Sequence, residues 1–155
     1  MTLTLRVRAI ADDHNALTSV QNLRSAPMSH TVIASPILIV DDDRAIRDLV
    51  SEYLEFEGIP FIVASNGAEA MDIVSRYPTT SLILLDMRMP IMDGWAFANA
   101  YRKSVANPAP IVAVTAAQNA AAWAREIQAV DYLSKPFDID ELMAVIQRTR
   151  RMSTD

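Results

Sequence analysis

Five polar residues lie at the ends of short apolar runs of the chain, and their types suit phosphate and metal chemistry. They are Asp41, Asp42, Asp86, Thr115 and Lys135. A short apolar run that ends in turn residues is typical of a buried strand in a parallel sheet. Because ligands bind such sheets at the carboxyl ends of the strands, we expect these side chains to converge on one rim.

The expected cluster combines carboxylates with one cation and one hydroxyl group. Carboxylates that are pressed together repel and raise one another's pKa unless a cation neutralises them. Mg²⁺ prefers oxygen ligands and is commonly held by one or two carboxylates together with phosphate oxygens. Lys135 adds a compact positive charge and Thr115 a hydroxyl group, and both suit the oxygens of a phosphoryl group. The residues therefore predict a small anion site with a divalent cation, most simply Mg²⁺.

The elements that position these residues alternate between strand and helix. Strands are expected over residues 37–40, 61–64, 82–85, 111–114 and 132–134. Helical patterns follow each strand. The first is an apolar stripe of Ile46, Leu49, Val50, Tyr53 and Leu54 that stops at Gly58, and the second follows a turn at Asn66-Gly67 and runs through Met71, Ile73, Val74 and Tyr77. The others are 95–103, an alanine-rich 116–127, and a stripe of Leu142, Val145, Ile146 and Thr149. Alternation with continuous apolar strands predicts a doubly wound α/β fold, in which helices cover both faces of a five-stranded parallel sheet.

The composition narrows the classes of function. A chain of 155 residues suits one domain, and a net charge of -5 argues against a surface that neutralises nucleic-acid phosphates. The absence of cysteine excludes disulfides and thiolate metal sites. Apolar runs are too short to cross a membrane, and no signal peptide is evident, so a cytoplasmic location is expected.

The first 35 residues differ from the remainder of the chain. Residues 1–35 have weak periodicity, and we expect a loosely ordered extension with a short helix around 16–23, followed by the main domain over residues 36–152. A second interpretation takes Met28 as the natural start, because the periodic pattern begins only a few residues later.

Four motifs, taken in order, resemble the receiver domain of two-component response regulators. They are the acidic cluster 41–43, the Asp-Met-Arg-Met-Pro-Ile-Met-Asp-Gly segment at 86–94, the Val-Thr-Ala at 114–116, and the Asp-Tyr-Leu-Ser-Lys-Pro-Phe segment at 131–137. The resemblance covers residues 37–150 and agrees with a flavodoxin-like sheet in the strand order 2-1-3-4-5.

The resemblance also implies a set of residues that hold a metal ion and accept a phosphoryl group. Asp86 would be the phosphoacceptor, Asp42 a metal ligand and Asp41 a ligand that acts through water. The main-chain carbonyl of Arg88 would be a further metal ligand. Asp43 is expected instead to cap the helix that follows.

Three further positions carry implied roles in signalling. Thr115 and Lys135 would contact the phosphoryl group, and Tyr132 would be the aromatic residue whose rotamer follows phosphorylation. Members of the family hold the corresponding Lys-Pro bond cis, which implies a cis bond between Lys135 and Pro136. Movement of Thr115 and Tyr132 would alter a surface formed by the fourth helix, the last strand and the last helix.

The implied function is that of a stand-alone response regulator, because the chain ends directly after the last expected helix. Its partners would be a histidine kinase or histidine phosphotransfer protein, which supplies the phosphoryl group, and a downstream effector protein. It would act as a signalling phosphoacceptor that catalyses only its own phosphorylation and dephosphorylation. The sequence leaves homodimerisation open and gives no reason to expect direct contact with nucleic acid or membrane insertion.

Two departures from the family pattern concern the segment before the last strand. The family usually has a glycine about seven residues before the lysine, where this chain has Gln128, and the segment 115–135 is about two residues shorter than usual.

The alanine-rich helix also carries Trp123 without an apolar stripe, which suggests an exposed interface residue. Trp95 and Phe97 are expected to anchor the third helix to the core.

Two other functions fit part of the pattern. A small phosphatase of the haloacid dehalogenase type also uses an aspartate nucleophile with Mg²⁺, and residues 41–43 provide an Asp-x-Asp after the first strand, but Ala45 stands where that family has Thr or Val. A degenerate receiver that serves only as an interaction scaffold is the third interpretation. The filled site positions argue against it, whereas Gln128 and the short segment favour it.

Overall fold

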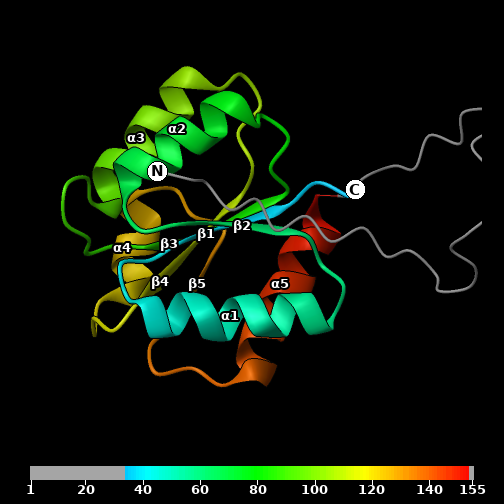
Figure 1. Ribbon diagram of the computed structural model, residues 1–155. Helices are drawn as coiled ribbons and strands as arrows, with labels where there is room; N and C mark the ends of the chain where they lie inside the picture. The colour runs from blue at the N-terminus through cyan, green and yellow to red at the C-terminus, as the bar shows by residue number, and fades with distance from the viewer. Residues whose placement is uncertain (1–33, 154–155) are drawn as a thin grey trace, which may run out of the picture.

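The computed structural model describes residues 34–153 of the chain (Figure 1). The expected extension therefore lies outside the described residues except for 34 and 35, as do the short helix over 16–23 and the alternative start at Met28. No helix within the described range has the length and apolar content needed to cross a membrane.

Five strands and five helices alternate along the described chain. The strands are β1 (Ile37–Val40), β2 (Phe61–Ala64), β3 (Leu82–Asp86), β4 (Ile111–Thr115) and β5 (Asp131–Ser134). The helices are α1 (Arg44–Phe56), α2 (Gly67–Arg76), α3 (Gly94–Ser104), α4 (Ala120–Glu126) and α5 (Ile139–Met152). The alternation predicted from apolar runs is confirmed.

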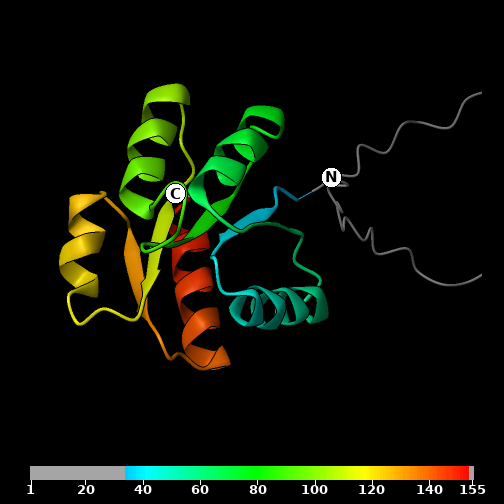
Figure 2. The ribbon, with the colours of Figure 1, turned by 60° about the vertical axis from the view of Figure 1, so that its left-hand side comes forward.

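The strands form one parallel sheet in the order β2-β1-β3-β4-β5, as expected. Figure 1 shows α1 and α5 together on one face, with α2 and α3 on the other. Figure 2 shows the same layers from the side, with α4 next to the edge strand β5. Because every strand runs in the same direction, the residues at all five carboxyl ends lie along one edge of the sheet.

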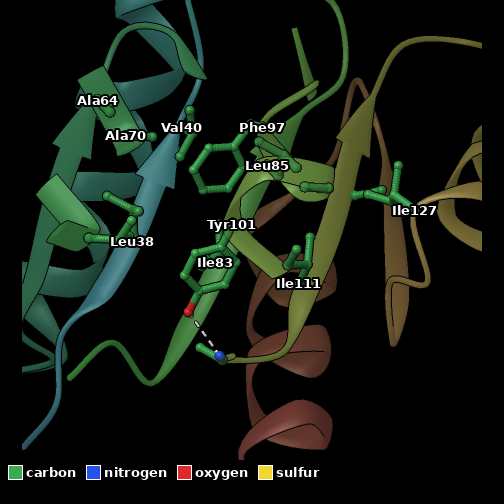
Figure 3. Close-up of a cluster of buried hydrophobic side chains, with 14 of the residues drawn as sticks. Leu38, Val40, Ala64, Ala70, Ile83, Leu85, Phe97, Tyr101, Ile111 and Ile127 are labelled. Carbon is green, nitrogen blue, oxygen red and sulfur yellow. Dashed lines mark hydrogen bonds between the residues drawn. The ribbon is translucent and has the colours of Figure 1, made fainter. Parts of the chain in front are cut away.

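Two apolar clusters cover the two faces of the sheet. Alternate residues of the central strands point to opposite faces, so that Leu38 and Val40 join the α2–α3–α4 side while Ile37 and Ile39 join the α1–α5 side. On the first side, Phe97 and Tyr101 stack with ring centroids 5.6 Å apart (Figure 3). The Tyr101 hydroxyl also accepts a hydrogen bond of 2.9 Å from the buried Ala109 N–H, shown dashed in Figure 3.

Side-chain caps fix where most helices begin. Asp43, Asn66, Asp93 and Asp138 each accept a backbone N–H in the first turn of the helix that follows. The expectation that Asp43 caps a helix is therefore confirmed. Gly67, expected in a turn, is instead the first residue of α2, because Asn66 already supplies the cap.

Two details of the helices differ from the sequence pattern. The alanine-rich helix was expected from residue 116, but α4 begins at Ala120, and no side chain caps it at Asn119. Alanine favours a helix without fixing its start, because the signals for a start are caps. Leu49, expected on the buried stripe of α1, is 42% exposed, since Val50 and Leu54 carry the contact with the sheet.

The ends of α1 and α4 share one hydrogen-bond pattern. After α1, the N–H groups of Gly58 and Ile59 donate to the carbonyls of Glu55 and Leu54, and after α4 those of Gln128 and Ala129 donate to the carbonyls of Arg125 and Ala124. This is the Schellman motif, which places the residue after the C-cap in the left-handed region. Gly58 has a φ of 67° and Gln128 a φ of 54°. Gln128 therefore occupies a backbone conformation that suits glycine.

Replacing Gln128 with glycine is expected to stabilise the domain. The left-handed conformation costs a residue with a Cβ on the order of 1 kcal/mol, and glycine adopts it freely. We expect Gln128→Gly to raise the free energy of unfolding in chemical denaturation by about that amount. Gln147→Gly, in the exposed interior of α5, is the matched control and is expected to lower it by about 1 kcal/mol. A loss of stability in Gln128→Gly would contradict this account of the helix end.

Candidate functional site

The carboxyl edge of the sheet brings the five sequence-predicted polar residues together. Asp86 and Thr115 are the last residues of β3 and β4, one residue beyond the expected strand ends, and Asp41 and Lys135 directly follow β1 and β5. The side chains that touch the core are largely shielded from water: Asp41 is 2% exposed, Thr115 3% and Asp86 6%. Asp42 lies exposed beside them.

Three of these carboxylates face one another across a small space. One carboxylate oxygen from each of Asp41, Asp42 and Asp86 lies within 4.8 Å of the other two. Lys135 is the cation of the cluster, with its Nζ 2.6 Å from an Asp41 oxygen and 3.7 Å from an Asp86 oxygen. The cluster thus has one ammonium group and three carboxylates, and it keeps an excess of negative charge that a hard divalent cation would neutralise.

Asp41 is held in place by contacts on both of its carboxylate oxygens. One oxygen accepts the Asp43 N–H at 2.9 Å, while the other faces Lys135. The Arg47 guanidinium adds a hydrogen bond of 2.6 Å to the Asp41 carbonyl, so α1 also fixes the main chain here. A carboxylate with both oxygens engaged suits the expected role of an acid that contacts a metal through water. Arg47 was not expected from the sequence, because nothing in a surface arginine signals a main-chain partner.

The electrostatics of the cluster act most strongly on Asp86. Burial raises the pKa of its carboxyl group to about 7, and the charge of Asp41 adds to the rise. The positive charge of Lys135 lowers this pKa, whereas a hydrogen bond with Asp42 and the negative charge of Asp42 raise it further. A divalent cation among the three acids would favour the ionised form of Asp86, which is the form that can act as a nucleophile.

The loop that follows Asp86 is tied to two helices. The Gly94 N–H donates to the Met87 carbonyl at 2.9 Å, and the Gly67 N–H at the start of α2 donates to the Met92 carbonyl at 3.0 Å. A Cβ at Gly94 would lie 2.7 Å from the Asp86 carbonyl oxygen, so the start of α3 can approach the site only as glycine. Between these ties, the exposed Ile91 has a φ of 73°, which a β-branched residue rarely adopts. These hydrogen bonds therefore hold Ile91 in a backbone conformation that its side chain disfavours.

The residues of the implied switch lie on neighbouring strands. The Thr115 hydroxyl accepts the Ala117 N–H at 3.3 Å, and Thr115 ends β4, the strand that pairs with β3. Tyr132 pairs with Ala113 in the sheet register and is 44% exposed. The Lys135–Pro136 bond is cis, as the resemblance implied.

Trp123 is only partly exposed, whereas the sequence suggested an exposed residue. Its ring packs against Trp95 edge to face, with the centroids 4.8 Å apart, and the Arg88 guanidinium lies 5.1 Å from its centroid. Helical periodicity could not predict these contacts, because it indicates only which face of a helix meets the sheet. The partners of Trp123 come instead from α3 and from the loop after β3. Phe97 is fully buried, as expected of an anchor for α3.

A parallel five-stranded sheet in this order, with three acids and a lysine at its carboxyl edge, is the arrangement of a two-component signalling domain. The chain belongs to the response regulator receiver domain family, whose family model matches residues 37–147. Receiver domains act in two-component signal transduction, and they generally bind Mg²⁺ at an acidic pocket of this kind.

Comparison with known proteins agrees with this assignment. The transcriptional regulatory protein CpxR of Escherichia coli strain K12 is 37% identical over 117 residues, which are 76% of this chain and 50% of CpxR. The response regulator MprA of Mycobacterium leprae is also 37% identical over 117 residues, 74% of this chain and 50% of MprA. The chain spans about half the length of these curated relatives. The crystal structure of the chemotaxis protein CheY4 of Vibrio cholerae is similar with a TM-score of 0.67 and 29% identity, covering 74% of this chain and 98% of that one.

The raised pKa of Asp86 predicts how stability depends on pH without divalent cations. Between about pH 4 and 7 the folded protein keeps a proton on Asp86 that the unfolded chain releases. The stabilisation that comes from this retained proton is thus full at low pH and is lost as the pH rises through about 7. Asp86→Asn removes this loss, so we expect it to stabilise the protein at about pH 8 by on the order of 1 to 3 kcal/mol, and by much less at about pH 5.

Chemical denaturation at the two pH values measures this difference. Glu52→Gln removes one charge from the exposed face of α1 and serves as the control, with little expected change at either pH. Equal effects of Asp86→Asn at both pH values would contradict the account of the acidic cluster.

Proposed function

We propose that this receiver accepts a phosphoryl group on Asp86 from a phosphohistidine of a histidine kinase or histidine phosphotransfer protein. One observation carries the proposal. The buried Asp86 carboxylate stands at a strand end with Lys135 at 3.7 Å and two further carboxylates within 4.8 Å. The family supplies the class of partner, since receiver domains interact with histidine kinases and downstream effectors.

The transfer itself is a displacement at phosphorus. An Asp86 oxygen forms the new O–P bond while the N–P bond to the donor histidine breaks, and the imidazole nitrogen keeps the electron pair of that bond. Lys135 and Thr115 would contact the oxygens of the phosphoryl group, and Lys135 would offset the negative charge that reaches the rim. The described residues 34–153 contain no histidine, so the donor histidine would come from a partner.

The acidic cluster fits a magnesium ion. Asp42 and Asp86 would bind it directly, Asp41 through water, and the main-chain carbonyl of Arg88 would complete the protein ligands. When bound, Mg²⁺ neutralises negative charge on the phosphoryl oxygens and on the carboxylates. The fit rests on the oxygen-only donor set and on the excess of carboxylate over ammonium groups in the cluster.

The output of the proposed reaction is a change at the surface near β5. A phosphoryl group on Asp86 adds charge and acceptor oxygens at the end of β3, next to the strand β4 that Thr115 ends. Movement of Thr115 toward it would give Tyr132 room to turn, which alters the face formed by α4, β5 and α5. The exposed positions of Val130 and Tyr132, each 44% accessible, support this face as the place where an effector protein binds.

We propose that the receiver acts as a separate signalling unit in the cytoplasm rather than as an enzyme on an external substrate. This chain covers 98% of the CheY4 chain, which supports a separate unit. It covers only half of CpxR and of MprA, which argues against one. Hydrolysis of the acyl phosphate by water would reset it. Membership of the receiver family argues against the phosphatase interpretation, and the net charge of -5 against direct nucleic-acid contact.

Incubation with acetyl phosphate tests the proposal without a partner protein. We expect intact mass spectrometry to show one added phosphoryl group in the presence of Mg²⁺ and none when the metal is chelated, because the cluster must be neutralised before an anion can approach. Asp86→Asn is expected to show no adduct under either condition. Asp93→Asn, a change of the same kind in an exposed helix cap, is the matched control and should be phosphorylated normally.

A folded protein with no adduct and no release of inorganic phosphate would support the scaffold interpretation instead. Release of phosphate without a stable adduct would indicate rapid hydrolysis of phosphorylated Asp86. In that case Asp86→Asn should abolish the release, and release that persists would contradict the proposal.

A further inference from the structure

Helix α4 depends on a few side-chain contacts for its position. It has only seven residues, four of them alanine, and no side-chain cap at Asn119. A hollow of about 570 Å³ separates it from α3, lined by residues that include Trp95, Asn99, Arg102 and Glu126. A helix of this length is not stable by itself, so α4 is held by its buried residues Ala120 and Ala124 and by the contacts across the hollow.

These contacts come from two ends of α3. At the start of α3, the Trp95 Nε1–H donates to the Glu126 carboxylate at 2.7 Å, and the Trp95 ring meets Trp123 edge to face. At its far end, the Arg102 guanidinium donates to the carbonyls of Ile127 at 3.0 Å and Gln128 at 2.8 Å. The Arg102 bonds hold the strained turn that ends α4, whereas Trp95 contacts Glu126, the last residue of α4, and Trp123 in its middle.

A third contact joins α4 to the acidic site itself. Arg88 follows Asp86 by two residues, and its guanidinium lies 5.1 Å from the centroid of the Trp123 ring. Within residues 34–153, Arg88 makes no ion pair with a carboxylate, so the face of Trp123 is the partner of its charge. A cation over an aromatic ring is attracted by the ring quadrupole, and this attraction depends on distance and angle.

We propose that Arg88 and Trp123 couple the acidic site to α4, so that a cation bound by the acids changes how α4 is held. The inference deepens the proposed function, because it adds a route of regulation from the same site. Arg88 lies between Met87 and Met92, whose carbonyls are tied to α3 and α2, and a cation held by the Arg88 carbonyl would shift the main chain between these ties and with it the guanidinium over Trp123. The two arrangements of this contact differ in energy, which is what a shift of α4 requires.

Linkage makes the coupling reciprocal. If a bound cation changes the Arg88–Trp123 contact, then removing that contact changes the affinity of the site for the cation by the same factor. We therefore expect Trp123→Leu to change the dissociation constant for Mg²⁺ by about two- to fivefold, the range that corresponds to a cation–π contact near the surface. A tryptophan that only fills space on α4 would leave this constant unchanged.

Tryptophan fluorescence and calorimetry test the proposal on the full chain. The chain has two tryptophans, and both belong to this cluster, so its emission reports on nothing else. Titration of the wild type with Mg²⁺ alone should change the emission. Compared at equal Mg²⁺ saturation, which calorimetry measures separately, Arg88→Ala should lose most of that change and Arg88→Lys should retain part of it. Arg125→Ala removes an exposed charge of α4 and should respond like the wild type.

Equal emission changes in the wild type and Arg88→Ala overturn the proposal, as does an unchanged Mg²⁺ affinity in Trp123→Leu. The outcome is separable from that of the proposed function. A protein that takes up a phosphoryl group but shows no Arg88-dependent emission change refutes the coupling alone. A protein that shows this change with Mg²⁺ and takes up no phosphoryl group refutes the phosphoacceptor role alone.

Discussion

The crowding of like charges at the carboxyl edge of the sheet is the constraint on which the rest of the site depends. Three carboxylates lie within 4.8 Å of one another, with Lys135 as the facing ammonium group. Burial and the neighbouring acids raise the pKa of Asp86 to about 7. The fold therefore keeps a proton on this carboxyl group at pH values where the same group in water would be ionised. A site of this kind gains most from a ligand that brings positive charge.

Rigid backbone keeps the acids from moving apart. Asp86 belongs to the buried central strand β3, and Lys135 follows the edge strand β5. Asp41 is held by the Asp43 N–H and by the Arg47 side chain of α1. The loop after Asp86 is fixed by hydrogen bonds to the starts of α2 and α3, and the close approach of Gly94 leaves no room for a side chain there. In contrast, α4 has only seven residues and begins without a side-chain cap.

The sequence predicted what depends on buried apolar runs and failed where contacts between distant segments decide. Ile37–Val40 and Leu82–Leu85 could be recognised as strands because they are apolar on both faces, and the positions of Asp41 and Asp86 followed from that. The start of α4 was placed four residues too early, since alanine fixes no boundary. The packing of Trp123 against Trp95 and Arg88 could not be foreseen, because the three residues come from separate elements. Gln128 was recognised as unusual by resemblance, but its positive φ follows only from the hydrogen bonds of the helix end.

The central claim is that Asp86, and neither of its two acidic neighbours, receives the phosphoryl group. Borohydride reduction of the phosphorylated protein converts an aspartyl phosphate to homoserine, and peptide mass mapping then locates that residue in the chain. The account predicts homoserine at position 86, where the carboxylate is buried at the end of β3 beside Lys135. Homoserine at position 41 or 42, with position 86 unchanged, would contradict it.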